Sequence, residues 1–339
     1  MTALLEVHDL DVEIPLPAGR LHAVRGVSLT ASAGQAVGLV GESGSGKSLT
    51  LRAIMDLLPV PARISAGTIV VQGVDVTGLS PTKRRAHLSS VLAMIFQDSL
   101  TALNPTMRVG DQVAEVPVRR LGMAKSTAHA RAVELLDQVG IKDPERRYRA
   151  YPHELSGGMR QRICIAIALS ADPGLILADE PTTALDVTIQ AQVLGVLAEL
   201  RLERAVGLVL VTHDLAVVSG TCEHLNVMYG GRIVETGSTA DLLDAPRHPY
   251  TAALLRSVPD PDVPVHRLLT IPGAPPDLMD LVPGCPFAPR CPAVIERCVT
   301  ELPPLLPVRS GHDSACWRAH DSEHWPKALA EAAAGEAPA

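Results

Sequence analysis

Aromatic side chains are scarce in this sequence, and its basic residues are outnumbered by its acidic ones. Phe, Trp and Tyr make up 2% of the 339 residues, and 30 Lys and Arg stand against 37 Asp and Glu, for a net charge of −7. Proteins that neutralise nucleic-acid phosphates usually carry a basic excess, and those that bind single strands add stacking rings. Both features are missing, which disfavours a nucleic-acid-binding platform.

Long apolar runs are missing as well. No stretch of the sequence approaches the roughly 20 uninterrupted apolar residues that cross a bilayer. The first residues, MTALLEVHDLDVEI, carry acids where a signal peptide would carry Lys or Arg ahead of an apolar run. We therefore expect the chain to start in the cytoplasm and to act on any membrane through partner proteins.

The rest of the composition is that of a folded protein with more than one unit. Hydrophobic residues make up 47% of the chain and charged residues 20%. Residues 36–40, AVGLV, are typical of a buried parallel strand, and 175–179 and 207–214 indicate two more strands. Residues 100 to about 155 have a mostly helical pattern. Strands that alternate with helices predict an α/β sheet.

The composition of the sequence changes at about residue 259. Nearly half of the 28 prolines lie between Pro259 and Pro307, which excludes long helices and central strands from that stretch. The last residues, 326–339, have low complexity, and we expect them to form a flexible tail.

A glycine-rich loop follows the first predicted buried strand. Residues 41–48 read G-E-S-G-S-G-K-S, and the apolar spacing after them predicts a helix that Pro59 stops. In this strand–loop–helix context, backbone N–H groups turn inward around a phosphate. Lys47 would reach the β- and γ-phosphates, and the Ser48 hydroxyl would bind Mg²⁺. The candidate ATP-binding residues are Gly41, Glu42, Ser43, Gly44, Ser45, Gly46, Lys47 and Ser48.

Two further motifs have residue types that suit phosphate chemistry. Asp179 and Glu180 end the apolar run LILADE, so Asp179 can hold Mg²⁺ and Glu180 can orient or deprotonate an attacking water. Ser156, Gly157 and Gly158 precede an apolar helical segment, which makes a second helix end able to bind an anion, or a simple helix cap.

These motifs in this order, LSGGMRQR and then LILADEP, resemble the ATP-binding cassette family of transport ATPases over about residues 5–255. The resemblance implies further roles: Gln97 touches Mg²⁺ and the attacking water, Asp186 belongs to the D-loop A-L-D that starts at Ala184, and His213 contacts the γ-phosphate. It also implies head-to-tail pairing of two cassettes. ATP would then lie between one phosphate loop and the signature residues of the partner, Ser156, Gly157, Gly158 and Gln161.

The fold implied by the resemblance is a P-loop cassette. It has a RecA-like α/β core, an antiparallel β subdomain and a helical subdomain at about residues 98–155, which would receive a permease's coupling helix. The family usually stacks adenine on an aromatic residue ahead of the phosphate loop. Here the stretch reads PAGRLHAV, so either His22 or aliphatic side chains would take that place.

The C-terminal part resembles the extension of the dipeptide/oligopeptide (and nickel) importer ATPases. The resemblance rests on RHPY with TAALLRSVPD, on GCPFAPRCP and on GHDSACW, and reaches about residue 320. It divides the chain into an ATP-binding domain at 1–258, a Cys-rich domain at 259–325 and the tail at 326–339.

Four of the six cysteines crowd into this extension, separated by 5, 6 and 17 residues: Cys285, Cys291, Cys298 and Cys316. In a reducing compartment such a group of cysteines indicates a metal site. A Pro-rich stretch buries little apolar area, so we expect it to be stabilised by a covalent or metal cross-link. The spacing suits zinc poorly, because structural zinc sites use closely spaced pairs. The resemblance implies a [4Fe–4S] cluster; zinc and unliganded thiols are the alternatives, and His312 is a reserve ligand. Cys164 and Cys222 are expected in the core.

The predicted function is that of an ATP-hydrolysing, energy-coupling subunit of a bacterial importer for di- or oligopeptides. The resemblance implies a peripheral position on the cytoplasmic face of the membrane and four kinds of partner: a second cassette (identical or paralogous), two permease subunits and an extracytoplasmic solute-binding protein. The alternatives are an importer for nickel or another small solute, a soluble cassette ATPase of DNA repair or translation, and a regulatory sensor built on the cysteines.

Overall fold

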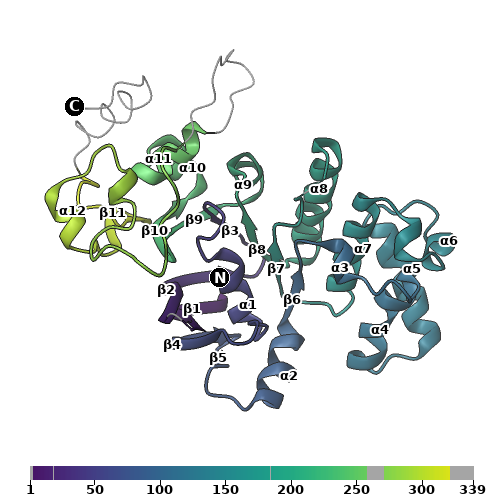
Figure 1. The fold of residues 1–339 in the computed structure, drawn as a ribbon. Helices are drawn as coiled ribbons and strands as arrows, with labels where there is room; N and C mark the ends of the chain where they lie inside the picture. The colour runs from purple at the N-terminus through teal and green to yellow at the C-terminus, as the bar shows by residue number, and fades with distance from the viewer. Residues whose placement is uncertain (1–2, 18, 184, 258–270, 321–339) are drawn as a thin grey trace. The chain divides into compact units, whose positions relative to one another are not determined.

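The computed structural model describes residues 3–17, 19–183, 185–257 and 271–320 (Figure 1). They form two compact units, each assembled from separate stretches of chain. The first, which we call the helical unit, consists mainly of Val70–Val211. The second, the loop unit, comprises Val7–Leu29, Val37–Ile69 and the described residues from Thr212 to residue 320.

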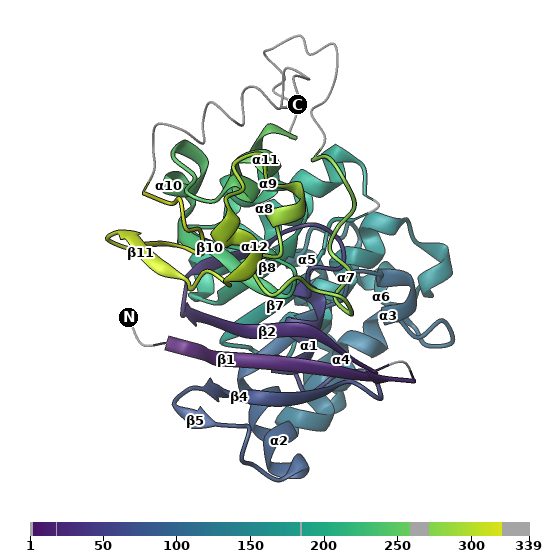
Figure 2. The same ribbon diagram turned by 60° about the vertical axis from the view of Figure 1, so that its left-hand side comes forward.

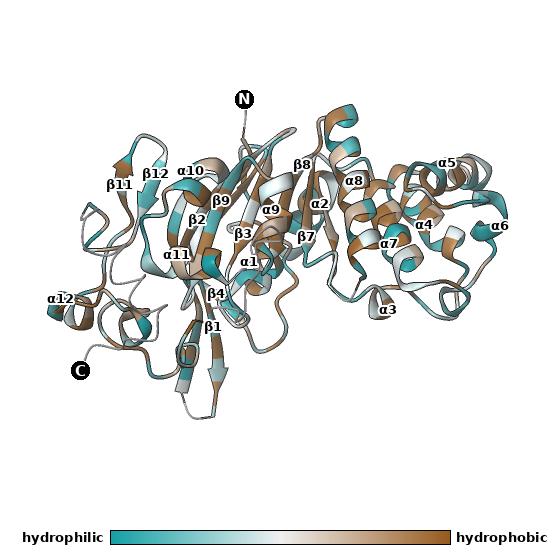
Figure 3. Ribbon diagram, turned by 90° about the horizontal axis from the view of Figure 1, so that it is seen from above, coloured by the Kyte–Doolittle hydropathy of each residue, from teal (hydrophilic) through white to brown (hydrophobic). Residues whose placement is uncertain are grey.

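Three parallel strands form the sheet of the helical unit: β6 (Leu92–Ile95), β7 (Leu175–Asp179) and β8 (Gly207–Thr212). Leu175 of β7 lies opposite Leu92 of β6 on one side and Gly207 of β8 on the other. Every residue of β7 and β8 is buried, and Figure 3 shows both strands as largely hydrophobic. Continuous apolar runs are typical of parallel strands covered on both faces.

Helices make up the rest of this unit, and α4 to α7 lie beside one another (Figure 1). Gly110 of α4 shows how closely they pack, because a Cβ there would stand 2.1 Å from the Tyr148 ring. The elements are α2 (Pro81–Val91), α3 (Ser99–Ala102), α4 (Val109–Leu121), α5 (Lys125–Gln138), α6 (Pro144–Tyr148), the 3₁₀ turn η1 (Pro152–Glu154), α7 (Gly157–Leu169) and α8 (Val187–Arg204). The mostly helical pattern predicted for 100–155 is confirmed.

The loop unit contains a mixed sheet in the order β11-β12-β10-β9-β3. β3 (Ala36–Val40) runs parallel to β9 (His224–Tyr229), which pairs antiparallel with β10 (Arg232–Ser238). Two short strands, β12 (His312–Ser314) and β11 (Leu306–Arg309), extend the sheet beyond β10. The C-terminal extension therefore adds strands directly to a sheet that also carries the phosphate loop.

A second layer of long strands belongs mainly to the loop unit. β1 (Ala3–Leu16) lies between β2 (Gly19–Ser32) and β4 (Arg63–Val71), as Figure 2 shows. The last residues of β4 pair with the two-residue strand β5 (Val74–Asp75). These strands form the antiparallel β subdomain that the resemblance implies.

Short helices complete the loop unit: α1 (Lys47–Ile54), α9 (Leu215–Thr221), α10 (Thr239–Asp244), α11 (Pro249–Arg256), the 3₁₀ turn η2 (Ala288–Arg290) and α12 (Glu296–Thr300). Within residues 271–320 no helix exceeds five residues, as the prolines predict. The predicted domain boundary at 258/259 and the predicted tail at 326–339 lie outside the described residues. In the part of the chain that is described, no helix is both long and apolar enough to span a bilayer.

Candidate nucleotide site and cysteine pocket

The phosphate-binding loop lies between β3 and α1 in the loop unit. Its glycines are required by close contacts: a Cβ on Gly41 would stand 2.1 Å from the Met228 carbonyl oxygen, and one on Gly46 would stand 2.5 Å from that of Ala23. Gly46 also has φ +103, a left-handed conformation that side chains disfavour. The sequence therefore places glycine where the loop meets neighbouring backbone.

Lys47, the first residue of α1, folds back over this loop. Its Nζ donates to the carbonyl oxygens of Gly41 at 2.7 Å and Glu42 at 2.9 Å, and to Ser45 Oγ at 3.4 Å. The helix N-cap, Gly46, has no side chain to satisfy the first N–H groups of α1. These N–H groups carry the positive end of the helix dipole. The Lys47 ammonium and the N-terminus of α1 therefore both place positive charge at the loop, which suits the binding of an anion such as phosphate.

In the helical unit, Glu180 follows the last residue of β7. Its Oε2 accepts hydrogen bonds from Gln97 Nε2 at 3.0 Å and from Thr183 Oγ1 at 2.8 Å. Its own N–H donates to the Val211 carbonyl oxygen at 2.9 Å. Glu180 has φ +45, which is uncommon outside glycine and is found where surrounding contacts hold a functional side chain in place.

The structure thus brings together Gln97 and Glu180, two residues that lie 83 positions apart in the sequence. Asp179, the residue before Glu180, ends β7 and is 1% exposed. Thr183 was not predicted. Its threonine hydroxyl sits one turn after the carboxylate, a spacing that could have signalled the contact.

The signature residues begin α7, as predicted. Ser156 is the N-cap, and its Oγ accepts a hydrogen bond from the Met159 N–H at 3.3 Å. A Cβ on Gly158 would stand 2.4 Å from Ile189 Cγ2, so this glycine permits close approach of α8. Gln161, on the same helix, is 2% exposed. A contact between these residues and nucleotide on a partner stays a prediction.

The remaining predicted site residues lie near strand and helix ends. Asp186 caps α8, where its Oδ1 accepts from the Ile189 N–H at 2.9 Å; Ala184 lies outside the described residues. His213 follows β8 and is exposed. His22 Nε2 lies 3.3 Å from Glu13 Oε1, and its role toward adenine stays a prediction.

The four extension cysteines line a single small pocket of the loop unit, together with residues that include His248, Phe287 and Trp317. Cys164 and Cys222 lie outside this pocket and are buried, as expected. Burial raises the pKa of Cys285 to about 11, and that of Cys291 and of Cys316 to about 12. Thiols in this environment stay protonated unless a cation compensates the thiolate charge.

His312, the predicted reserve ligand, is committed elsewhere. It is fully buried, its Nε2 donates to Glu235 Oε1 at 2.7 Å, and its Nδ1 accepts from Arg309 Nε at 3.1 Å. Glu235 also accepts from the N–H groups of Arg247 and His248. The His312–Glu235 pair therefore fastens β12 to β10. His248 lines the cysteine pocket instead, a placement that the sequence did not indicate.

Comparison with known proteins identifies the family. A family model described as ABC transporter matches residues 24–183, and one described as oligopeptide/dipeptide transporter, C-terminal region, matches 234–298. The oligopeptide transport ATP-binding protein OppD of Salmonella typhimurium is 46% identical over 93% of this chain and 93% of its own length. OppD of Mycobacterium bovis is 49% identical over 94% of this chain; the chain spans about half, 52%, of that relative's length.

Comparison with solved structures identifies the same kind of protein, an ATP-binding cassette. The dimeric, post-hydrolysis structure of the ATP-binding cassette MJ0796 with ADP and Pi matches at a TM-score of 0.63 and 25% identity, over 69% of this chain and 98% of that one. The predicted fold class, a P-loop cassette with α/β sheets, is confirmed. The chain belongs to the ABC transporter family, in the group of oligopeptide and dipeptide transport ATP-binding proteins.

Proposed function

We propose that this chain binds MgATP and hydrolyses it as the energy-coupling subunit of an importer for di- or oligopeptides. The observation that carries the proposal is the Glu180 carboxylate, held by Gln97 and Thr183 at the end of a buried strand. The phosphate loop and the names of the relatives support it. Fixed hydrogen bonds leave a general base in one orientation, which is what proton abstraction from water requires.

The residues of the loop unit would bind the triphosphate. The loop N–H groups and the N-terminus of α1 offer donors, and Lys47 would exchange its three oxygen partners in the loop for phosphate oxygens. A charged amine that already lies over the loop needs only a side-chain rotation for this exchange. His213 would contact the γ-phosphate.

The residues of the helical unit would serve the hydrolytic step. Glu180 would take a proton from the attacking water, while Gln97 and Thr183 keep its carboxylate oriented. Asp179, Gln97 and Ser48 are oxygen donors of the kind that Mg²⁺ prefers, and would hold the ion that neutralises the phosphates. We propose that Ser156, Gly157 and Gly158 close the site of a second cassette, because a helix N-terminus suits the γ-phosphate of a neighbouring subunit.

The test is release of inorganic phosphate from MgATP by the purified chain, compared with Asp179→Asn. Loss of the carboxylate should abolish Mg²⁺-dependent release while the variant stays folded. Equal rates for the two proteins would refute the assignment of Asp179. Uptake of a labelled dipeptide by cells, lost when the chain carries Glu180→Gln, tests the transported class.

The proposed assembly is the one that the family resemblance implies. The partners would be a second cassette, two permease subunits and an extracytoplasmic solute-binding protein, with this chain peripheral on the cytoplasmic face of the membrane. We further propose an ATP-binding domain at 1–258, whose helical part at about 98–155 receives the permease, a Cys-rich domain at 259–325 and a tail at 326–339. The helices α3 to α6 support the helical part.

We also propose that the four extension cysteines hold a metal centre, with [4Fe–4S] preferred and zinc as the alternative. Two observations bear on the fit. The four sulfurs line one pocket, and His248 Nε2 is buried there without a hydrogen-bond partner among the described residues. Because His248 Nδ1 accepts from the Tyr250 N–H at 3.1 Å, the proton lies on Nε2.

Burial lowers the pKa of His248 to about 3, so Nε2 is a neutral N–H donor suited to a thiolate or sulfide. Among the described side chains, no three of His, Cys, Asp or Glu are already spaced for a single metal ion. When bound, the metal centre would cross-link the Pro-rich segment. Anaerobic preparations with four iron and four sulfide per chain would support the cluster, and one zinc per chain with no iron would refute it.

A further inference from the structure

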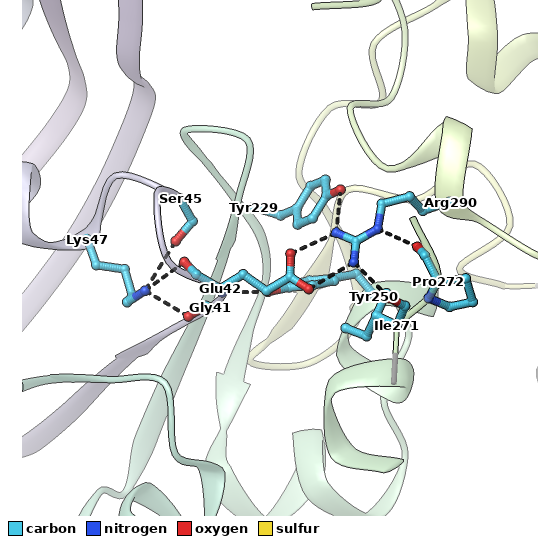
Figure 4. A network of polar contacts seen from close by, with 9 residues as sticks. All are labelled: Gly41, Glu42, Ser45, Lys47, Tyr229, Tyr250, Ile271, Pro272 and Arg290. Atoms are coloured by element: carbon cyan, nitrogen blue, oxygen red, sulfur yellow. Dashed lines mark hydrogen bonds and ion pairs between the residues drawn. The ribbon is translucent and has the colours of Figure 1, made fainter. Parts of the chain in front are cut away.

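Arg290, from the cysteine-rich segment, reaches the phosphate loop. Its Nη1 and Nη2 donate to the two carboxylate oxygens of Glu42 at 2.7 and 3.0 Å, a two-pronged ion pair (Figure 4). Nη1 also donates to Tyr229 Oη at 3.1 Å, and the remaining donors reach the carbonyl oxygens of Pro272 and Ile271. A planar guanidinium with this many partners has one orientation.

The Arg290–Glu42 ion pair is largely buried. The side chain of Arg290 is 6% exposed and that of Glu42 is 22% exposed. Burial by itself would lower the pKa of Arg290, but its hydrogen bonds to Glu42 and Tyr229 outweigh that effect and raise the pKa. The charge is therefore kept, and the pair is screened less than an ion pair on the surface.

The backbone of Glu42 is held as well. Its N–H donates to Tyr250 Oη at 2.8 Å, and Tyr250 is fully buried. The Tyr250 ring packs against Tyr229 and Phe287, with centroid separations of 4.5 and 5.5 Å. The second residue of the loop is thus fixed through its N–H and through its side chain.

Glu42 places a negative charge in the loop that would bind a polyphosphate. An uncompensated carboxylate in the loop would repel the triphosphate, and in a partly buried setting the repulsion would be substantial. Arg290 cancels this charge while its neighbour in sequence, Cys291, lines the cysteine pocket. We propose that Arg290 is a positioning residue that neutralises and clamps Glu42, so that the cysteine-rich segment sets the affinity of the phosphate loop for nucleotide.

This inference rests on the proposed function and is tested by a double-mutant cycle on MgATP affinity, measured by titration calorimetry. Arg290→Gln should weaken binding about tenfold, which is about 1.4 kcal/mol. Glu42→Gln alone should strengthen binding, because it removes the repelling carboxylate and leaves the charge of Arg290 beside the loop. The double variant should recover most of the loss, because the carboxylate that Arg290 compensates is gone. The loss in Arg290→Gln should shrink at high salt.

Two further variants keep the test decisive. Arg290→Lys retains the charge and should stay within about threefold of the wild type, even if Arg290→Gln proves too unstable to measure. Glu301→Gln is the matched control, because it removes the acid of another ion pair of the same segment, Arg297–Glu301 at 2.8 Å. It should leave affinity unchanged.

The inference is overturned if a folded Arg290→Gln variant binds like the wild type, if the double variant is as weak as Arg290→Gln, or if Arg290→Lys loses tenfold. In each of these cases the wild type still binds nucleotide, so the proposed function stands. A wild-type chain that does not bind MgATP overturns the proposed function itself.

Discussion

Replacement of Glu180 by glutamine is the sharpest perturbation of the proposed chemistry. The change keeps the size of the side chain and one oxygen that can accept from Gln97 and Thr183, the present partners of Oε2. It removes the negative charge and the ability to accept a proton. Catalysis by a positioned base contributes about 10²–10⁴-fold, or about 2.7–5.5 kcal/mol of barrier.

Glu180→Gln should therefore lower kcat for phosphate release at least 100-fold, while MgATP affinity is kept or slightly raised because a negative charge is removed near the phosphates. The assay pairs phosphate release at saturating MgATP with calorimetric binding. Glu203→Gln, on an exposed position of α8, makes the same change of net charge and should have no effect.

Thr183→Val should have an effect on kcat that lies between the wild type and Glu180→Gln. It removes the Thr183 donor to Oε2, and a hydrogen bond to a charged group is worth about 1.5–3 kcal/mol. If half of this serves to orient the carboxylate, kcat should fall about 4- to 13-fold with binding unchanged. The reasoning is refuted if Glu180→Gln retains more than a third of the wild-type rate, or if Thr183→Val is as inactive as Glu180→Gln.

Three further predictions concern stability and the thiols. At Gly46, φ is +103 and a Cβ would stand 2.5 Å from the Ala23 carbonyl oxygen, whereas at Gly73 φ is +74 and a Cβ would meet open space. Denaturant unfolding should show that Gly73→Ala lowers the free energy of unfolding by about 1 kcal/mol and that Gly46→Ala lowers it by at least about 2 kcal/mol more. Equal losses would contradict the contact at Gly46. His312→Ala leaves Glu235 buried without its imidazole partner and should cost about 3 kcal/mol of unfolding free energy; a loss under 1 kcal/mol would show that the pair is not needed. Because burial raises the pKa of Cys291 to about 12, its alkylation in metal-free folded protein at pH 8 should be far slower than in unfolded protein, and similar rates would be incompatible with the buried pocket.

Local patterns predicted the parts of the fold that depend on short stretches of sequence. The strands at 36–40 and 175–179 have the predicted bounds, and Ser156 caps the helix after it. Apolar runs and cap residues carry this information within a few positions. The helix after the phosphate loop was predicted to run on to Pro59, but α1 ends at Ile54. Asp56 has φ +57 there, and Leu57 is exposed.

Local sequence patterns could not predict the long-range contacts that complete the sites. Arg290 and Glu42 are 248 positions apart, and nothing in the spacing of either residue indicates the other. The sequence indicated His312, and not His248, as a reserve ligand of the cysteines, but the β10–β12 pairing places His312 against Glu235. Long-range pairing of this kind depends on how strands and turns assemble, which composition and periodicity do not specify.

The central claim is that the loop at 41–48 binds a nucleotide triphosphate through Lys47. Titration calorimetry of the wild type and of Lys47→Ala with MgATP tests it most directly. Removing the amine that now bridges three loop oxygens should weaken binding about 100-fold or more, about 2.7 kcal/mol, while thermal unfolding confirms a folded variant. A folded Lys47→Ala protein that binds MgATP as tightly as the wild type would contradict the claim.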